Sequence, residues 1–298
     1  MIAPMTKPPT MPTRPPMSKP PISKAVVSNK TFTIKPWVGS NEGEKIILYG
    51  ASGIGKTTLA ATAPNAVFIG VDDGARKIRN PLTGQPVLAI EGIETFADLR
   101  ACLRTPNLFP AGTSLVIDTI TQVQKLAEQY TFETVKVSGQ IAKSLEDYGY
   151  GKGYRFLCET MRLLLTDMDP LVRAGVNIVL LAQDAPRTVK NPIGADWDEA
   201  GPELNATGNP NVRAEYCQWA DHILRVAYPP ANVRTTNSKA TKGKVSGSYE
   251  QQIYAKGDLH FVAKNRMNGS LPDAVSFASP QDRSLWEFIF EGAKAASE

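Results

Sequence analysis

The residues best suited to carry chemistry form a glycine-rich turn that follows an apolar run at residues 46–49. Gly50 and Gly55 bracket the turn, and Lys56 and Thr57 follow it, in the spacing of a loop that cradles phosphate groups. Glycines let backbone N–H groups point at phosphate oxygens, the lysine reaches the β- and γ-phosphates, and the threonine hydroxyl ligates Mg²⁺. The alternative is an ordinary turn between a strand and a helix. The predicted nucleotide site comprises Gly50, Ala51, Ser52, Gly53, Ile54, Gly55, Lys56, Thr57 and Thr58.

Acidic residues end two further apolar runs. Asp72 and Asp73 follow residues 66–71, and Asp118 follows residues 114–117. In open α/β sheets ligands bind at the carboxyl ends of the strands, so both sets of carboxylates stand where a ligand would lie. An apolar strand that ends in an acid downstream of a phosphate-binding turn indicates a Mg²⁺ site, and we assign that role to Asp118. An acid that only caps a helix is the alternative.

A polar residue also ends a third apolar run, because Gln183 follows residues 176–182. A glutamine at such a strand end can sense the γ-phosphate or orient the attacking water. A glutamine that merely caps or solvates the strand end is the alternative. Counting the phosphate-binding turn, four strand ends then carry groups that suit a nucleotide with Mg²⁺. We infer that they meet at one edge of one sheet.

Strand-sized apolar runs alternate with helix-forming segments along most of the chain. This alternation predicts an α/β fold with a mostly parallel central sheet flanked by helices on both faces. One helix is expected to begin at residue 154 and to end before Pro170. A last helix, capped by Ser279, is expected to run to about residue 295. Five core strands are expected near residues 46, 66, 114, 176 and 222, with a further strand at residues 259–263.

Composition limits the class of protein. The chain has 298 residues, a net charge of +4, two histidines, and three cysteines without C-x-x-C spacing, which disfavours structural zinc and a disulfide framework. No apolar run approaches a membrane span and the start lacks a signal-peptide pattern, so we expect a cytoplasmic protein. The expected parts are a disordered, proline-rich basic tail at 1–24, the α/β domain at 25–278 and a C-terminal helix at 279–298.

Three segments are expected to be loops: 137–153, 184–211 and 229–250. The first holds Tyr150 and Lys152 among glycines, a mixture that can stack bases and touch phosphates, or simply a loop whose tyrosines pack on the domain. The third is rich in basic residues and favours contact with a nucleic-acid backbone over a plain solvated loop. Its basic side chains are Arg234, Lys239, Lys242 and Lys244.

The motifs together resemble the RecA-like branch of phosphate-loop ATPases. Residues 50–57 are similar to the Walker A motif, 115–118 to Walker B, and 68–72 to the strand that carries the family's catalytic carboxylate. Gln183 is similar to the glutamine that ends a later core strand in RecA-type proteins. Residues 264–266 resemble the K-N-R motif, in which the basic side chains reach the γ-phosphate bound by the neighbouring subunit.

More narrowly, residues 40–275 look like the phage-encoded AAA-type proteins that include the Sak-type single-strand annealing proteins. The resemblance implies ATP and Mg²⁺ as ligands and DNA-stimulated hydrolysis. It also implies single-stranded DNA as a partner, and a homo-oligomeric ring or filament with ATP at the subunit interface. In these roles Asp72, or else Asp73, polarises the attacking water, and Lys264 and Arg266 act on the neighbour's nucleotide.

One departure from the family keeps two other functions open. The family's catalytic acid is usually glutamate, whereas this chain has only Asp72 or Asp73 at that place. The shorter side chain slightly favours a nucleotide-switched assembly or binding protein that hydrolyses ATP weakly and holds a protein partner. A helicase or helicase loader shares the fold and most motifs, but no extra domain for such a role is evident.

Overall fold

The computed structural model describes residues 41–71, 77–229, 250–267 and 271–291, and the backbone at 232–234 and 244–246. The chain divides into two units, Met1–Trp37 and Val38–Glu298, and every described residue belongs to the second. Several predicted features lie outside the described residues: the tail at 1–24, Asp72, Asp73, Lys239, Lys242 and the end of the C-terminal helix.

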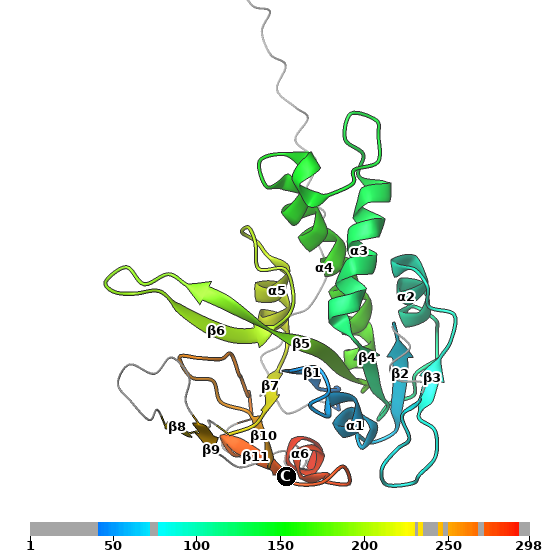
Figure 1. Ribbon diagram of the computed structural model, residues 1–298. Coiled ribbons are helices and arrows are strands. Elements are labelled where there is room, and N and C mark those ends of the chain that lie inside the picture. Colours follow the sequence, from blue (N-terminus) through cyan, green and yellow to red (C-terminus); the bar gives the residue numbers. More distant parts are fainter. Residues whose placement is uncertain are drawn as a thin grey trace, which may run out of the picture. The chain divides into compact units, whose positions relative to one another are not determined.

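A single mixed sheet forms the centre of the second unit (Figure 1). Its nine strands within the described chain are β1 (Lys45–Gly50), β2 (Ala66–Gly70), β3 (Leu88–Ile90), β4 (Ser114–Asp118), β5 (Asn177–Val189), β6 (Trp197–Pro202), β7 (His222–Ala227), β10 (Gln251–Tyr254) and β11 (Ala274–Phe277). Separately, β8 (Asn232–Arg234) pairs with β9 (Lys244–Ser246).

The order of the strands confirms the predicted fold class. The path is β11-β10-β7-β1-β5-β4-β2-β3, with β6 attached to β5. The six strands from β7 to β3 pair in parallel, and β10, β11 and β6 pair antiparallel. All five expected core strands are present, and β1 lies at the centre with parallel neighbours on both sides. The carboxyl ends of β1, β2, β4, β5 and β7 therefore meet at one edge, as the sequence indicates.

Helices cover both faces of the sheet (Figure 1). They are α1 (Lys56–Ala61), α2 (Phe96–Leu103), α3 (Ile120–Thr134), α4 (Lys152–Arg173), α5 (Val212–Trp219), α6 (Ser284–Trp286), the 3₁₀ helix η2 (Leu145–Tyr148) and the π-helical η3 (Glu287–Glu291). Side chains alternate along β1, so Ile47 and Tyr49 pack with α2–α5 while Ile46 and Leu48 pack with α1 and α6. None of the helices in the described ranges is both long and apolar enough to cross a bilayer.

The predicted end of the long helix at Pro170 is wrong, because α4 continues to Arg173. Proline removes one N–H donor and crowds the preceding turn. Here it stands in the last turn, where few helical hydrogen bonds remain to be lost, and its own carbonyl still accepts from Ala174 N at 3.1 Å. The buried face of α4, including Leu164 and Met168, holds the helix on the sheet. Tertiary packing therefore outweighs the local signal.

The predicted loop at 184–211 is also wrong, because much of it forms a hairpin. β5 runs on past Gln183 to Val189 and pairs antiparallel with β6, from Asp184 opposite Pro202 to Val189 opposite Trp197. The hairpin projects from the sheet (Figure 1). Its prolines and glycines suggested a loop, but a two-stranded ladder leaves one side of each strand unpaired, and proline is tolerated there.

The predicted strand at 259–263 does not form as a separate strand. Instead, a linking segment at residues 260–264 joins the hairpin to the start of β7. Ala200 N donates to His260 O at 2.7 Å, and Val262 N donates to Ala200 O at 2.9 Å. Lys264 then exchanges two backbone hydrogen bonds with Ile223, at 2.9 and 2.8 Å. The segment is thus pinned to β6 at one end and to β7 at the other.

The C-terminal helix begins later than predicted, at Ser284 rather than after Ser279. Asp282, rather than Ser279, hydrogen-bonds the first turn of the helix. Its Oδ1 accepts from Ser284 N at 2.9 Å and from the Ser284 hydroxyl at 2.7 Å. The helix is held against α1 by buried Trp286, whose Nε1 donates to Leu59 O at 3.0 Å. The predicted cap at Ser279 is therefore wrong, because Ser279 and Pro280 lie in the turn before the helix.

Candidate functional site

The glycine-rich turn lies at the carboxyl end of β1, in the centre of the sheet. A side chain at Gly50 is sterically excluded, because a Cβ there would lie 2.3 Å from Val226 O. Gly55 precedes α1 with φ at 97°, in the left-handed region that favours glycine. Both glycines of the motif are therefore required by the backbone. The turn has the strand–loop–helix context that the phosphate-binding motif needs.

Lys56 is directed back into the turn. Its Nζ donates to Gly50 O and Ala51 O, each at 2.9 Å, and to Gln183 Oε1 at 3.2 Å. The side chain is only 6% exposed. Burial lowers the pKa of the Lys56 ammonium, and the nearby carboxylates of Asp118 and Asp184 partly oppose this effect. Because all three of these acceptors are neutral oxygens, this buried cation is suited to an anionic ligand such as a phosphate.

Thr57 and Asp118 form the predicted metal-binding pair. The Thr57 hydroxyl donates to Asp118 Oδ2 at 2.9 Å, and Asp118 is buried at the end of β4. A hydroxyl and a carboxylate are hard oxygen donors, the type that Mg²⁺ prefers. Thr57 directly follows Lys56, the residue that would bind the phosphates, so the pair lies beside the expected phosphate position. The residues present therefore fit Mg²⁺ bound together with a nucleoside triphosphate.

Gln183 is brought beside the turn by the register of the sheet, in which it pairs with Gly50. Its side chain accepts from Lys56, and its backbone N donates to Thr121 Oγ1 at 3.2 Å. The glutamine side chain thus contacts Lys56 directly rather than capping the strand. It also marks the point at which β5 leaves the sheet and becomes the hairpin.

An ion pair that the sequence did not reveal lies next to Gln183. Arg225 Nη2 donates to Asp184 Oδ2 at 3.1 Å, and Asp184 Oδ1 and Arg225 Nε are buried without partners. The guanidinium also lies over the ring of Phe261, 5.0 Å from its centroid. The pair connects the base of the hairpin to β7 and to the linking segment. No local pattern links these residues, which are 41 positions apart.

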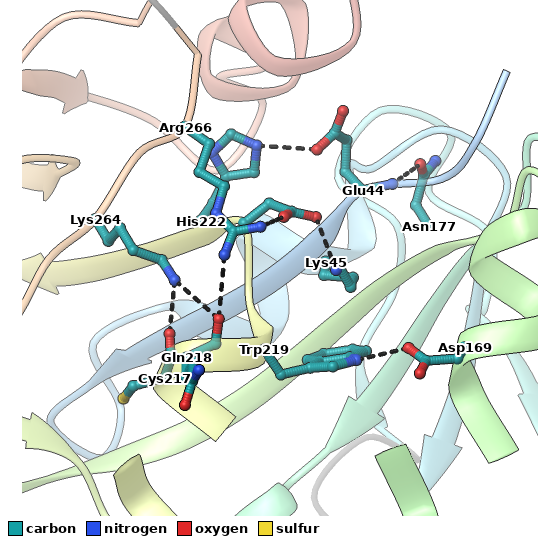
Figure 2. A network of polar contacts seen from close by, with 11 residues as sticks. Glu44, Lys45, Asp169, Asn177, Cys217, Gln218, Trp219, His222, Lys264 and Arg266 are labelled. Atoms are coloured by element: carbon teal, nitrogen blue, oxygen red, sulfur yellow. Dashed lines mark hydrogen bonds and ion pairs between the residues drawn. The ribbon is translucent and has the colours of Figure 1, made fainter. Parts of the chain in front are cut away.

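Lys264 and Arg266 lie near Lys45 and His222 (Figure 2). Lys45 and His222 begin β1 and β7, so the two cations lie at the opposite end of these strands from the chain's own phosphate-binding turn. Lys264 Nζ donates to Cys217 O at 2.6 Å, and Arg266 donates to Gln218 O at 3.2 Å, so both satisfy carbonyls at the end of α5. Arg266 also pairs with Asp221 at 2.7 Å. In this arrangement neither cation reaches the nucleotide site of its own chain.

Arg266 is nevertheless accessible, with 54% of its side chain exposed. It lines an open cleft of about 640 Å³ together with Lys45, Arg162 and Arg173, and with acidic side chains as well. Lys45 shares Asp221 with Arg266, at 3.7 Å (Figure 2). The predicted action on a neighbour's nucleotide stays a prediction, for which this position at least leaves the guanidinium available.

Tyr148 and Tyr150 of the 137–153 segment, and Tyr154 just after it, differ in how far they are buried. Tyr148 packs inward, with its hydroxyl donating to Val135 O at 2.6 Å and its ring 5.3 Å from that of Phe156. Tyr154 donates to Glu146. Tyr150 alone of the three is fully exposed, and Lys152 beside it is exposed too. Contact of these two residues with DNA stays a prediction.

The basic 229–250 segment contains a short ladder within its described part. Arg234 of β8 pairs with Lys244 of β9 across the antiparallel strands. The predicted loop is therefore partly a hairpin. Its role in binding a nucleic acid stays a prediction.

The strands β10 and β11 also bring residues to the turn that sequence reasoning missed. Phe277 Cε1 lies 3.2 Å, and Gln251 Oε1 3.6 Å, from the position that a Cβ on Gly55 would take. The signal was the apolar–polar alternation of residues 274–277 between Pro272-Asp273 and Ser279-Pro280, which is typical of a short strand.

The fold and the site together define a phosphate-loop ATPase. The chain belongs to the family described as AAA domain, whose model matches residues 42–267. No curated protein matches the chain. Among solved structures it is similar to a KaiC-like protein, PH0186, from the hyperthermophilic archaeon Pyrococcus horikoshii OT3. That protein is 14% identical, with a TM-score of 0.38 over 80% of this chain and 88% of the other. At this TM-score the likeness adds nothing to the assignment.

The Thr57–Asp118 pair gives a first prediction. Thr57→Val keeps the shape of the side chain but removes the hydroxyl, so we expect the Mg²⁺ concentration for half-maximal ATP hydrolysis to rise about tenfold or more. Thr57→Ser keeps the hydroxyl and should stay close to the wild type. The measurement is ATP turnover across a Mg²⁺ titration. Equal Mg²⁺ dependence of the two variants would contradict the assignment.

Proposed function

We propose that this AAA-domain ATPase hydrolyses ATP while acting on single-stranded DNA, in a phage recombination or annealing system of the Sak type. One observation carries the proposal. Gln183 contacts Lys56 in the nucleotide site and is also the residue from which β5 continues into the projecting hairpin. A polymer bound to the hairpin would therefore contact the same strand, β5, whose Gln183 contacts Lys56.

The side chains of the site can be given distinct roles in hydrolysis. Lys56 binds the phosphates, and Gln183 responds to the γ-phosphate. Thr57 and Asp118 hold Mg²⁺, which when bound neutralises charge on the phosphate oxygens. Asp72, or else Asp73, orients the attacking water. Most of the rate gain is then electrostatic, because fixed charges and donors face the charge that develops.

The site becomes complete only in an oligomer under this proposal. Lys264 and Arg266 would act on the nucleotide of the next subunit, which places ATP at the interface between copies of the chain. Their position at the amino end of the strands supports a role across an interface rather than within one chain. Such a head-to-tail arrangement builds a ring or a filament.

DNA contact is assigned to the hairpin and to the 229–250 segment. On the hairpin, Arg187 and Lys190 are exposed, and Ile193 near the tip is 95% exposed. Exposed cations bind phosphates without regard to sequence, and an exposed apolar tip offers a surface for bases. Both features suit single-stranded DNA.

The test is ATP turnover and oligothymidine binding, measured with Lys56→Ala as the blank. We expect single-stranded DNA to stimulate turnover. A site that contacts about four phosphates should lose about 50-fold in DNA affinity between about 50 and about 200 mM salt. Arg187→Ala should reduce that salt dependence, because it removes one contact. Arg79→Ala, which removes the same charge from the turn before β3, should not.

Turnover that ignores DNA, with no salt-dependent DNA binding, would overturn the DNA role. The second candidate would then hold: an assembly protein that uses ATP to set its oligomeric state and binds a protein partner. The observation that favours it is the aspartate at positions 72 and 73, where the resembling family has glutamate. That candidate requires ATP binding to change the oligomer without appreciable turnover.

A further inference from the structure

A hollow of about 340 Å³ opens directly beside the phosphate-binding turn. Its lining includes Gly53, Gly55 and Thr58 of the sequence motif, Gln251 at the start of β10 and Phe277 at the end of β11. The volume is within the range of small-molecule sites, which starts at about 300 Å³. Any molecule in the hollow would touch the backbone of the turn itself.

The two strands hold Gln251 and Phe277 as a pair. They stand directly opposite each other in the β10–β11 ladder, so both side chains lie on the same face of the sheet. Both also approach Gly55, with Phe277 Cε1 and Gln251 Oε1 at 3.2 and 3.6 Å from its would-be Cβ. Phe277 is buried in the core, whereas Gln251 is half-buried. An aromatic ring and an amide therefore border the same space.

The lining is chemically unlike a phosphate site. Among the described residues that border the hollow there is no lysine, arginine or histidine. An amide, hydroxyls, apolar groups and one carboxylate make up the rest: Thr58, Glu250, Gln251, Phe277, Ala278, Ser279 and Pro280. A neutral, partly aromatic group suits such a wall, whereas a phosphate would find no cation there. The anionic part of a nucleotide belongs instead with Lys56 on the other side of the turn.

We propose that this hollow holds the base and sugar of the bound nucleotide, and that Gln251 makes the site prefer adenine to guanine. The inference rests on the nucleotide binding in the proposed function. A glutamine amide offers a donor and an acceptor together, which match adenine at N6 and its neighbouring ring nitrogen. The corresponding edge of guanine shows two acceptors, N7 and O6, which arginine or lysine matches. The described lining contains a glutamine but neither arginine nor lysine, so it matches adenine better than guanine.

The existing hydrogen bonds of Gln251 and of its neighbour Glu250 decide which of the two side chains can bind a base. Its Nε2 donates to the Tyr228 hydroxyl at 3.4 Å, near the limit for a hydrogen bond. Glu250, the one carboxylate at the wall, accepts a hydrogen bond from the Ser276 hydroxyl. The Gln251 amide therefore loses only a weak hydrogen bond to Tyr228 if it turns to a ligand. The Glu250 carboxylate is instead hydrogen-bonded to Ser276 of the adjacent strand β11. Recognition of the base falls to Gln251.

The test compares three ligands with Mg²⁺ by calorimetry: ATP, GTP and inorganic tripolyphosphate, which has no base. Wild-type protein should bind ATP more tightly than either of the others. Gln251→Leu should weaken ATP binding about 10- to 100-fold, leave tripolyphosphate unchanged and reduce the ATP-to-GTP preference. Gln252→Leu is the matched control, because the next residue of β10 points to the opposite face. It should change none of the three.

The outcomes separate this inference from the proposed function. If Gln251→Leu binds ATP as the wild type does, or loses ATP and tripolyphosphate equally, the base site is elsewhere and the proposal is overturned. If the wild type binds ATP no better than tripolyphosphate, the base makes no contact and the proposal is again overturned. If the wild type binds neither, the nucleotide site itself is wrong, and the proposed function fails together with this inference.

Discussion

Lys56→Ala should reduce ATP hydrolysis at least about 100-fold, since removing one donor that stabilises developing charge typically costs that much or more. The lysine is the only cation whose ammonium reaches into the turn within the described residues, where it contacts Gly50 O, Ala51 O and Gln183. The effect should appear in ATP binding as well as in turnover. Steady-state phosphate release and calorimetry measure the two separately.

The same substitution should leave the fold intact. The folded state holds the Lys56 ammonium almost fully buried, with a pKa lowered by that burial, so the charged side chain is itself costly to the folded chain. Its loss removes that cost while it also removes three hydrogen bonds, and the two effects oppose each other. Circular dichroism and thermal unfolding should match the wild type closely. Lys256→Ala, at an exposed lysine paired with Asp273, is the control for activity. A fully active Lys56→Ala protein would refute the site.

Arg266→Ala should reduce ATP hydrolysis about 1,000-fold while leaving nucleotide binding nearly unchanged. An arginine supplied to a neighbour's γ-phosphate is worth about that factor or more, and it acts mainly on the transition state. The fold should survive, because Arg266 is 54% exposed and exposed ion pairs contribute little. Equal losses in binding and turnover would argue against the role across the interface.

Mixing two inactive variants tests the interface directly. Lys56→Ala subunits keep Arg266, and Arg266→Ala subunits keep an intact phosphate-binding turn, so a mixed oligomer contains some complete sites. With random mixing in equal amounts, about a quarter of the sites should be complete, so about that fraction of wild-type turnover should return. Lys45→Ala is the matched control for the loss of a partner of Asp221. If mixing restores nothing, Arg266 serves only its own chain.

The sequence predicted the central part of the fold because that part depends on local patterns. The strands β1 and β4 and the first half of β5 are largely apolar runs buried on both faces. The strand–turn–helix pattern around Gly50 and Gly55 is typical of a phosphate-binding loop. The contacts of Lys56 with Gln183 and of Thr57 with Asp118 follow once the strands are parallel and adjacent. The meeting of these side chains was therefore predictable without coordinates.

The remainder depends on partners that are distant in sequence. Proline and glycine after Gln183 predict a loop, whereas the segment forms a hairpin through its pairing with β6. The extension of α4 past Pro170 depends on packing against the sheet. The approach of Gln251 and Phe277 to Gly55 depends on β10 pairing with β7, which single-sequence patterns do not encode.

The linking segment at 260–264 has a thermodynamic consequence for the proposed assembly. It is hydrogen-bonded to the hairpin through Ala200 and to β7 through Ile223, and it ends at Lys264. A ligand on the hairpin and a nucleotide held partly by the next subunit would thus share one rigid connection. Any coupling between their binding free energies would then be equal in both directions. The factor by which a bound polymer raises the affinity for ATP would equal the factor by which bound ATP raises the affinity for the polymer. Because each nucleotide would also contact the next subunit, occupancy of one subunit would favour occupancy of its neighbour.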